Sequence, residues 1–314
     1  MVGVSGSGTS AFEPAYRSLH RRGELYERAR EGIDRLHDCD LCARYCHVDR
    51  HVGIKGAVCR TGHLARVASY GAHHGEERPL SGRDGSGTIF FSWCSLRCEY
   101  CQNWDISQRR SGQEMRGTDL AVMMLELESA GCHNINLVTP SHVVAQVLEA
   151  VVIAAEAGLN LPLVYNSAGY DSPEALALLD GVIDIYMPDM KYGDDAAARR
   201  YSHVPDYVRF NRAAVREMHR QVGDLTLDED GVARRGLLVR HLVLPGDAAA
   251  SEAVLGFIAE ELGPGTYVNL MDQYRPCYRA DELPELDHRL DPAEFERVRS
   301  IATDLGLHRL DPSD

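Results

Sequence analysis

Three cysteines stand close together in one short segment, spaced as ligands of a metal cluster would be. The segment runs from Trp93 to Asn103, and its thiols, four and three residues apart, belong to Cys94, Cys98 and Cys101. Three thiolates can bind three irons of a four-iron cubane and leave the fourth iron open to a substrate. A catalytic zinc keeps one position free in the same way, whereas a structural cluster normally has a fourth cysteine. A zinc knuckle or a chance grouping of thiols is the alternative interpretation.

A second group of thiols occurs earlier in the chain. Its spacing is C-x2-C-x3-C-x12-C, and its members are Cys39, Cys42, Cys46 and Cys59. Four thiolates can hold a structural zinc ion or an auxiliary iron–sulfur cluster. Zinc sites more often show two C-x2-C pairs, and only one is present here, so iron–sulfur is slightly favoured while the metal stays open. The plain alternative is a group of buried thiols without metal.

Composition narrows the class of protein. The chain has 314 residues, nine cysteines and a formal net charge of −14. This acidic balance argues against a nucleic-acid partner, which needs a clustered basic surface. No apolar stretch reaches the roughly eighteen residues of a membrane span, and the Gly/Ser-rich start lacks the pattern of a signal peptide. We therefore expect a cytoplasmic protein whose grouped, reduced cysteines bind metal.

The cysteine loop must be positioned by a larger fold, and from residue 88 onward β-rich runs alternate with helical patterns. The expected strands are 88–93, 135–139, 161–166, 183–187, 237–244 and 267–271. The expected helices are 118–130, 141–157, 172–179, 194–222 and 251–262. Such alternation is typical of a parallel sheet with right-handed crossovers. We therefore predict an α/β protein with a partial (β/α)6 TIM-like barrel and a small N-terminal Cys-rich region.

The chain is expected to have three parts. Residues 1–11 form a disordered tail, and residues 12–86 form a helix followed by the Cys-rich metal-binding region. Residues 87–314 form the barrel with its C-terminal helix, and the Gly/Ser-rich stretch 81–87 marks the boundary. An acidic turn at 228–231 predicts a small hairpin before the fifth strand.

Polar side chains gather where the predicted strands end. Chemistry in barrels of parallel strands takes place at these carboxyl ends. Asp189 and Lys191 follow the fourth strand, and Lys191 is one of only two lysines among 33 basic residues. A compact ammonium is a good partner for a ligand carboxylate. Arg240, on the fifth strand, can either reach a bound ligand or pair with Asp189.

Together these segments resemble the radical S-adenosylmethionine (SAM) superfamily. The C-x3-C-x2-C loop with an aromatic residue before its third cysteine is highly specific, and the other segments are individually weak but occur in the matching order. The resemblance covers most of the chain and is closest to the pyruvate formate-lyase activating enzyme-like group, particularly members with an extra N-terminal cysteine region. The other segments that carry it are Cys39–Cys46, Asn136–His142, Met187–Tyr192, Arg240–Gly246 and Met271–Pro276.

The resemblance implies a reaction and its cofactors. In that superfamily a [4Fe–4S] cluster on the three cysteines binds SAM and cleaves it reductively to a 5′-deoxyadenosyl radical, which abstracts a hydrogen atom from a substrate. It also implies that Tyr100 lies beside the adenine and that Asp189 and Lys191 contact the methionyl moiety. The other residues expected to bind SAM, from their places in the cysteine loop, at the strand ends or on the fifth strand, are Asn103, Thr139, Ser141, Asn166 and Arg240.

Two departures from the family pattern concern ligand binding. Thr139-Pro140-Ser141 stands where the family has Gly-Gly-Glu, so the amino group of SAM must be bound differently. Gln273 stands where activating enzymes commonly have a histidine. These departures weaken the transfer of the family's substrate to this chain, although not the transfer of SAM chemistry.

Three functions stay open at this point. The enzyme could activate a glycyl-radical enzyme by abstracting hydrogen from a glycine of that partner, or it could act directly on a small-molecule metabolite. A non-catalytic iron–sulfur electron-transfer or metal-binding protein is the third, disfavoured by the open three-cysteine site with Asp189 and Lys191. The expected partners are a small-molecule or protein substrate and a reductant such as flavodoxin or ferredoxin, without nucleic acid or membrane.

Overall fold

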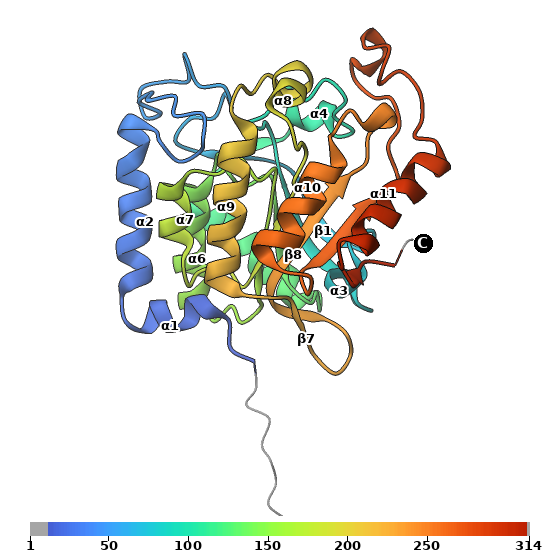
Figure 1. Cartoon of the computed structure of the whole chain (residues 1–314). Coiled ribbons are helices and arrows are strands. Elements are labelled where there is room, and N and C mark those ends of the chain that lie inside the picture. The colour runs from blue at the N-terminus through green and yellow to red at the C-terminus, as the bar shows by residue number, and fades with distance from the viewer. Residues whose placement is uncertain (1–11, 313–314) are drawn as a thin grey trace, which may run out of the picture.

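The computed structural model describes residues 12–312. The disordered tail expected at residues 1–11 therefore lies outside the described residues. A central sheet runs through the molecule and helices cover its outer side (Figure 1). None of the described helices is both long and apolar enough to cross a membrane.

Six parallel strands form the centre of the sheet, and each is hydrogen-bonded to the next in the order β2-β4-β5-β6-β8-β9. Their bounds are β2 Ser86–Phe91, β4 Ile135–Val138, β5 Leu163–Ser167, β6 Ile185–Pro188, β8 Ala233–Leu242 and β9 Tyr267–Met271. All six overlap the strands expected from the sequence. The prediction of a partial (β/α)6 barrel is confirmed.

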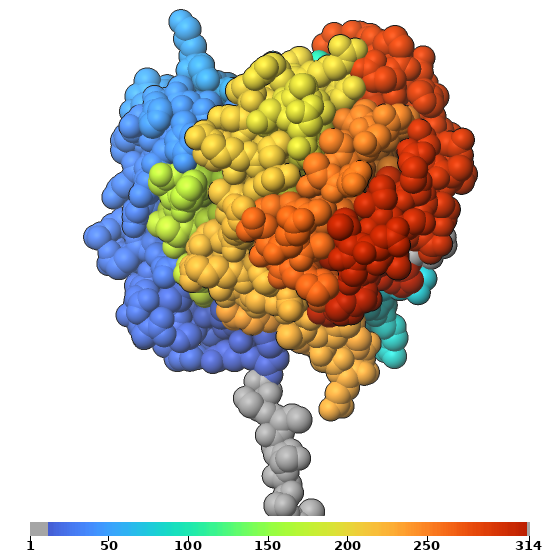
Figure 2. Space-filling view, viewed as in Figure 1, coloured from blue at the N-terminus to red at the C-terminus, as the bar shows by residue number. Residues whose placement is uncertain are grey.

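Helices connect the strands and pack on the outside of the sheet. They are α5 Gly117–Ser129, α6 Val144–Glu156, α7 Pro173–Leu179, α8 Asp195–Ser202, α9 Tyr207–Val222, α10 Ser251–Phe257, which continues into η3 Ile258–Leu262, and, after β9, α11 Pro292–Asp304. In the space-filling view α8 to α10 cover the middle of one face, between the N-terminal segments in blue and the C-terminal segments in red (Figure 2). The predicted helix 194–222 is two helices, because residues 203–206 interrupt it.

The N-terminal helices dock on the barrel through α6. Helices α1 (Ala15–Arg21) and α2 (Glu24–Asp34) lead into η1 (Arg35–Asp38) and then into the first cysteine group. Helix α6 is mostly apolar and largely buried, because α2 and α5 both pack against it. Gly32 permits the close approach, since a Cβ there would lie 3.3 Å from the Cα of Ala145.

Three strands were missing from the sequence interpretation, and they lie at the two edges of the sheet. β1 (Ala65–His73) pairs antiparallel with β2, β3 (Gln113–Met115) pairs antiparallel with β1, and β10 (Arg309–Leu310) pairs parallel with β9. β1 places part of the 12–86 region in the same sheet as the barrel, and we keep the division at residue 86 as a proposal. β7 (Thr226–Leu227) and the start of β8 form the predicted hairpin.

A side-chain hydrogen bond spans the open side of the barrel. Glu77, which precedes the short helix α3 (Arg78–Ser81) between β1 and β2, accepts a hydrogen bond from Asn269 Nδ2 of β9 at 2.9 Å. Since β2 and β9 are the first and last strands of the six, this bond shows that the sheet curls toward closure. Backbone pairing between these two strands is absent in the part of the chain that the structure describes, so the barrel is partial.

A buried carboxyl group fastens α1 to the sheet. Asp184 accepts hydrogen bonds from the backbone amides of Ala15 in α1, at 2.8 Å, and of Leu163 in β5, at 3.0 Å. Burial raises the pKa of Asp184 from its usual value near 3.8 to about 7, although both amides favour the charged form. The folded state therefore holds a proton on this group more tightly than the unfolded chain does.

This difference predicts a pH-dependent stability. The contribution of Asp184 is fully present below its unfolded pKa, near 4, and is lost as the pH rises through about 7. It amounts to at most about 4 kcal/mol between these limits, at about 1.4 kcal/mol per pKa unit. Asp184→Asn cannot ionise, so its deficit relative to the parent should be largest near pH 4 and should shrink toward pH 8. Chemical denaturation over this range measures the difference, and a deficit independent of pH would contradict the expectation.

Candidate functional site

The loop Trp93–Asn103 follows directly after β2, the first strand of the barrel. Its base is closed by a backbone hydrogen bond of 2.9 Å from the Trp93 amide to the Ile106 carbonyl in the short helix α4 (Trp104–Ser107). Trp93 has a φ of 68°, in the left-handed region that non-glycine residues rarely adopt. Backbone strain of this kind is maintained only where the surrounding structure imposes it. The chain thus makes an unfavourable turn immediately before the first cysteine.

Each sulfur of this loop has a hydrogen-bonding neighbour. The pairs are Cys94 Sγ with the Leu96 amide at 3.3 Å, Cys98 Sγ with the Ser202 hydroxyl at 3.0 Å, and Cys101 Sγ with the Ser107 hydroxyl at 3.1 Å. Hydrogen bonds to the sulfurs are one of the means by which proteins adjust the potential of an iron–sulfur cluster. Ser202 comes from the end of α8, so the barrel and the loop both supply donors.

The three thiols lie within electrostatic reach of one another. Burial, and next the neighbouring Cys98, raises the pKa of Cys94 to about 12 and that of Cys101 to about 11. Lys191 acts on all three thiols in the opposite direction. A bound metal would deprotonate such thiols outright.

A site for a single metal ion needs donors arranged around one point, in addition to donors of the right type. Within residues 12–312, no group of three or more His, Cys, Asp or Glu side chains is arranged to hold a metal ion. The loop fits an iron–sulfur cluster through its thiol donors, their mutual proximity and the hydrogen bonds to their sulfurs. These properties, rather than a preformed single-ion site, are what the structure shows there.

Four of the predicted SAM-binding residues meet at neighbouring strand ends. Arg240 of β8 donates from Nε to Asp189 Oδ1 at 2.9 Å and from Nη2 to Asn166 Oδ1 at 2.7 Å. Lys191 Nζ donates to the other oxygen of Asp189 at 2.6 Å. Arg240 therefore pairs with Asp189, which was one of the two interpretations of its position.

Both members of the Asp189–Lys191 pair are charged because each compensates for the burial of the other. Burial alone would raise the pKa of Asp189, but Arg240 and then Lys191 outweigh it and the pKa is lowered. Burial alone would lower the pKa of Lys191, but Asp189 and the nearby Cys98 outweigh it and the pKa is raised. A fixed cation thus lies between the strand ends and the cysteine loop.

The remaining predicted SAM-binding residues are spread more widely. Tyr100 is buried, with its hydroxyl 2.8 Å from that of Tyr192. Asn103 is exposed at the start of α4, and its side chain does not cap that helix. Thr139, with a φ of 61°, donates its amide to the Asn166 carbonyl at 2.8 Å. Ser141 is buried beside the Asp171 carboxyl group. Thr139 therefore adjoins the Asn166 network, whereas Ser141 is directed to a different partner.

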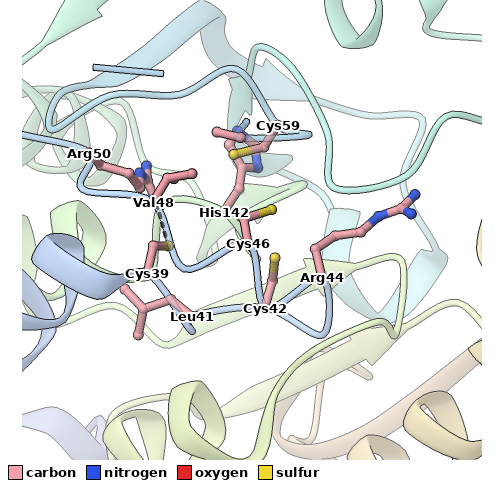
Figure 3. Close-up of a pocket in the computed structure, with 10 residues that line it drawn as sticks. Cys39, Leu41, Cys42, Arg44, Cys46, Val48, Arg50, Cys59 and His142 are labelled. Atoms are coloured by element: carbon pink, nitrogen blue, oxygen red, sulfur yellow. Dashed lines mark hydrogen bonds between the residues drawn. The ribbon is translucent and has the colours of Figure 1, made fainter. Parts of the chain in front are cut away.

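The N-terminal cysteines line a small cavity (Figure 3). Side chains of Cys39, Cys42, Cys46 and Cys59 all contribute to its wall. Backbone hydrogen bonds from the Cys39 amide to the Val48 carbonyl, 3.2 Å, and from the His47 amide to the Cys39 carbonyl, 3.1 Å, fold the loop back on itself. The side chains leave ≈ 10 Å³ of free space between them, about what one water molecule needs.

These four thiols also act on one another. Burial, followed by the neighbouring Cys59, Cys39 and Cys46, raises the pKa of Cys42 well above its usual value. The buried guanidinium of Arg50 donates to Cys39 Sγ at 3.6 Å and opposes the effect of burial on Cys59. A cationic group beside clustered thiols is the environment that favours thiolates.

One residue of this cavity escaped the sequence analysis. His142 follows β4 in the barrel, yet its side chain lines the cavity of the N-terminal cysteines. The histidines that are near those cysteines in the sequence, His37, His47 and His51, are exposed instead. The only signal in the sequence was the position of His142 at the end of a predicted strand, which gives no hint of its neighbours.

The two cysteine loops touch each other. Arg44 Nε, from the N-terminal loop, donates to the Ser95 carbonyl at 2.7 Å, and Arg97 Nη2 donates back to the Val58 carbonyl at 3.1 Å. The guanidinium of Arg60 stacks over the Trp93 ring at 5.1 Å. Both loops therefore form one continuous surface at the carboxyl end of the barrel strands.

The fold and these two loops define a partial (β/α)6 barrel protein with paired cysteine sites. The chain is 30% identical over 279 residues to the uncharacterized protein MJ0674 of Methanocaldococcus jannaschii, a match that covers 86% of this chain and 75% of that protein. The chain belongs to the same family as that protein. No family model matches it.

Solved structures with a partly similar arrangement are those of TYW1 with a lysine–pyruvate adduct bound and of HydG, a maturase of the [FeFe]-hydrogenase. The first has a TM-score of 0.45 at 11% identity, covering 69% of this chain and 73% of that chain. The second has a TM-score of 0.47 at 14% identity, covering 69% of this chain and 48% of that chain. Likenesses at this level carry no functional argument, which must come from the site.

Proposed function

We propose that the protein is a radical SAM enzyme of the cytoplasm. The observation that carries this proposal is the three-thiol loop at the carboxyl end of the first barrel strand, beside the partly buried cation Lys191. A [4Fe–4S] cluster there, with SAM and a reductant such as flavodoxin or ferredoxin, supplies reductive cleavage to a 5′-deoxyadenosyl radical and hydrogen abstraction from a substrate. The test is formation of 5′-deoxyadenosine by anaerobically reconstituted protein.

In this proposal each side chain at the neighbouring strand ends has its own role. Lys191 binds the methionyl carboxylate. Its ammonium group has three hydrogens and donates one of them to Asp189, which leaves two for the ligand. Asp189 holds the ammonium in place, and Arg240 keeps Asp189 ionised. Asn166 positions Arg240 through its side-chain oxygen.

The other proposed contacts use side chains near the same end of the barrel. Tyr100 offers the edge of a ring that is fixed by Tyr192 and Tyr274, which suits packing against an adenine. Asn103 has an exposed amide, which suits hydrogen bonding to the nucleoside. Thr139 lies on the amino-group side, where the family pattern is not kept, whereas Ser141 is buried against Asp171 and does not contribute there.

A second cavity supports a small-molecule substrate over a glycine loop of a partner protein. It has a volume of ≈ 350 Å³, beside Arg240, and its wall includes Glu77, Asn269 and Asp272. This volume is in the range of small-molecule sites. The Glu77–Asn269 hydrogen bond lies in the wall of the same cavity. Metabolite-dependent formation of 5′-deoxyadenosine would agree with this assignment, whereas stimulation only by a glycyl-radical enzyme would contradict it.

We propose further that the N-terminal cysteines hold an auxiliary iron–sulfur cluster rather than zinc. The spacing supports this assignment, because zinc sites more often show two C-x2-C pairs and only one is present here. All four thiols line one cavity, as the ligands of a single centre must.

Metal analysis tests this assignment. Reconstituted protein should contain about eight irons per chain, and the variant with Cys94, Cys98 and Cys101 all changed to Ala should retain about four irons without zinc. One zinc per chain in that variant would show a structural zinc site instead. A variant without any metal would leave only a group of buried thiols.

A further inference from the structure

One ring nitrogen of His142 forms a hydrogen bond, and the other has no hydrogen-bond partner among residues 12–312. Its side chain is 1% exposed, and Nε2 lies 2.9 Å from the carbonyl oxygen of Ser92. A carbonyl oxygen only accepts, so Nε2 must carry the hydrogen of a neutral imidazole. The lone pair of that tautomer is then on Nδ1.

The side chain that carries this second nitrogen lines the cavity of the N-terminal cysteines. Nδ1 of His142 is buried and has no hydrogen-bond partner among residues 12–312. Figure 3 shows the His142 side chain beside Cys59 and Cys46, in the wall that these thiols share. A buried polar atom without a partner costs roughly 1–3 kcal/mol and calls for an explanation.

We propose that Nδ1 of His142 is a ligand of the metal centre at the N-terminal cysteines. Metal-bound histidines typically donate the other ring N–H to a backbone carbonyl, which fixes the tautomer and the orientation of the ring. The bond to Ser92 is of this kind. The centre then has mixed thiolate and imidazole ligands, a combination that raises the potential of iron–sulfur clusters above that of all-thiolate ones.

The same histidine connects the two cysteine sites. Ser92 lies two residues before Cys94, and its carbonyl accepts the hydrogen bond of the proposed ligand. The path from the N-terminal centre to the catalytic loop therefore runs through one imidazole and two residues of backbone.

A second consequence concerns the number of ligands. A cubane with every iron bound by the protein takes four ligands, and the cavity offers four thiols and one imidazole. One thiolate is then dispensable. Among single Cys→Ala changes at Cys39, Cys42, Cys46 and Cys59, one should leave the resistance of the iron to a chelator unchanged, whereas an all-thiolate cubane would lose a ligand and become more labile in each.

The decisive measurement uses the full chain with Cys94, Cys98 and Cys101 changed to Ala, so that only the N-terminal centre is observed. Pulsed electron paramagnetic resonance of the reduced centre, with 15N-labelled histidine, should show the strong coupling of a directly bound nitrogen. His142→Gln should remove this coupling. Its amide nitrogen can take the place of Nε2 toward Ser92, but it has no group at the position of Nδ1. We expect resistance of the iron to a chelator to fall at least about 10-fold, as for lost metal-site interactions.

A matched control variant shows whether an effect comes from losing a metal ligand or only from losing a buried histidine. His241 is also fully buried, but Nδ1 is bonded to the Met190 carbonyl and Nε2 to Ser251. His241→Gln should keep the nitrogen coupling and the iron of the N-terminal centre. The proposal rests on the proposed iron–sulfur centre, and the outcomes distinguish the two. Iron without nitrogen coupling, unchanged in His142→Gln, would refute ligation alone, and absence of iron from the parent background would refute both.

Discussion

Changing Cys94, Cys98 and Cys101 together to Ala will abolish the formation of 5′-deoxyadenosine from SAM. The three sulfurs lie within electrostatic reach of one another at the end of β2, and each has a hydrogen-bonding neighbour. Without them the catalytic iron has no ligands in this loop. We expect loss of turnover to background and loss of the SAM-induced change in the spectrum of the reduced cluster, measured by mass spectrometry and electron paramagnetic resonance.

The control for this change is a cysteine outside both groups. Cys132 is buried next to the start of β4 and lines neither cysteine site. Cys132→Ala removes a thiol that is buried, as Cys98 is, and should leave SAM cleavage intact. If the triple variant still cleaved SAM at the rate of the Cys132→Ala protein, the loop would not hold the catalytic cluster and the proposed function would be wrong.

Changing Lys191 to Ala should weaken SAM binding by about 1.5–3 kcal/mol, roughly 10- to 150-fold, as for a hydrogen bond to a charged group. The variant should still fold, because Arg240 continues to neutralise the partly buried Asp189 after the ammonium is gone. Iron content should not change, since Lys191 is not an iron ligand. Titration of the reconstituted protein with SAM, followed by its spectral change, gives the dissociation constant.

Two further variants sharpen the experiment at Lys191. Lys191→Arg should restore binding only in part, because a planar guanidinium is longer than the ammonium and Arg240 already lies on the other oxygen of Asp189. Lys55→Ala removes the other lysine, which is exposed, and should bind SAM as the parent does. Equal SAM affinity in Lys191→Ala and Lys55→Ala would show that Lys191 serves only the ion pair with Asp189.

The chain pattern alone was enough to predict the six barrel strands and the helices between them. Buried parallel strands are short apolar runs, and the helices have a different period, so both are visible locally. The interpretation failed for β1, β3 and β10 at the sheet edges. β3 and β10 are very short and β1 is half exposed, so these strands lack the continuous apolar pattern that marked the others.

One part of the candidate site could likewise be predicted from the sequence, and another part could not. The spacing of Cys94, Cys98 and Cys101 places three thiols in one loop whatever the rest of the fold does, so the sequence by itself determined that donor set. Arg240 needed the tertiary structure, because its pairing with Asp189 depends on β6 and β8 being neighbours while β7 lies outside the main strand order.

The surroundings of His142 are the clearest example of what the sequence could not predict. Its role depends on the N-terminal loop folding over the end of β4, which brings Cys59 and Cys46 to a residue far away in the chain. It depends equally on a hydrogen bond to Ser92 that selects which ring nitrogen is free. Neither spacing nor periodicity records such contacts, because they arise from packing between segments. Only the tertiary structure could therefore place an imidazole among the N-terminal thiols.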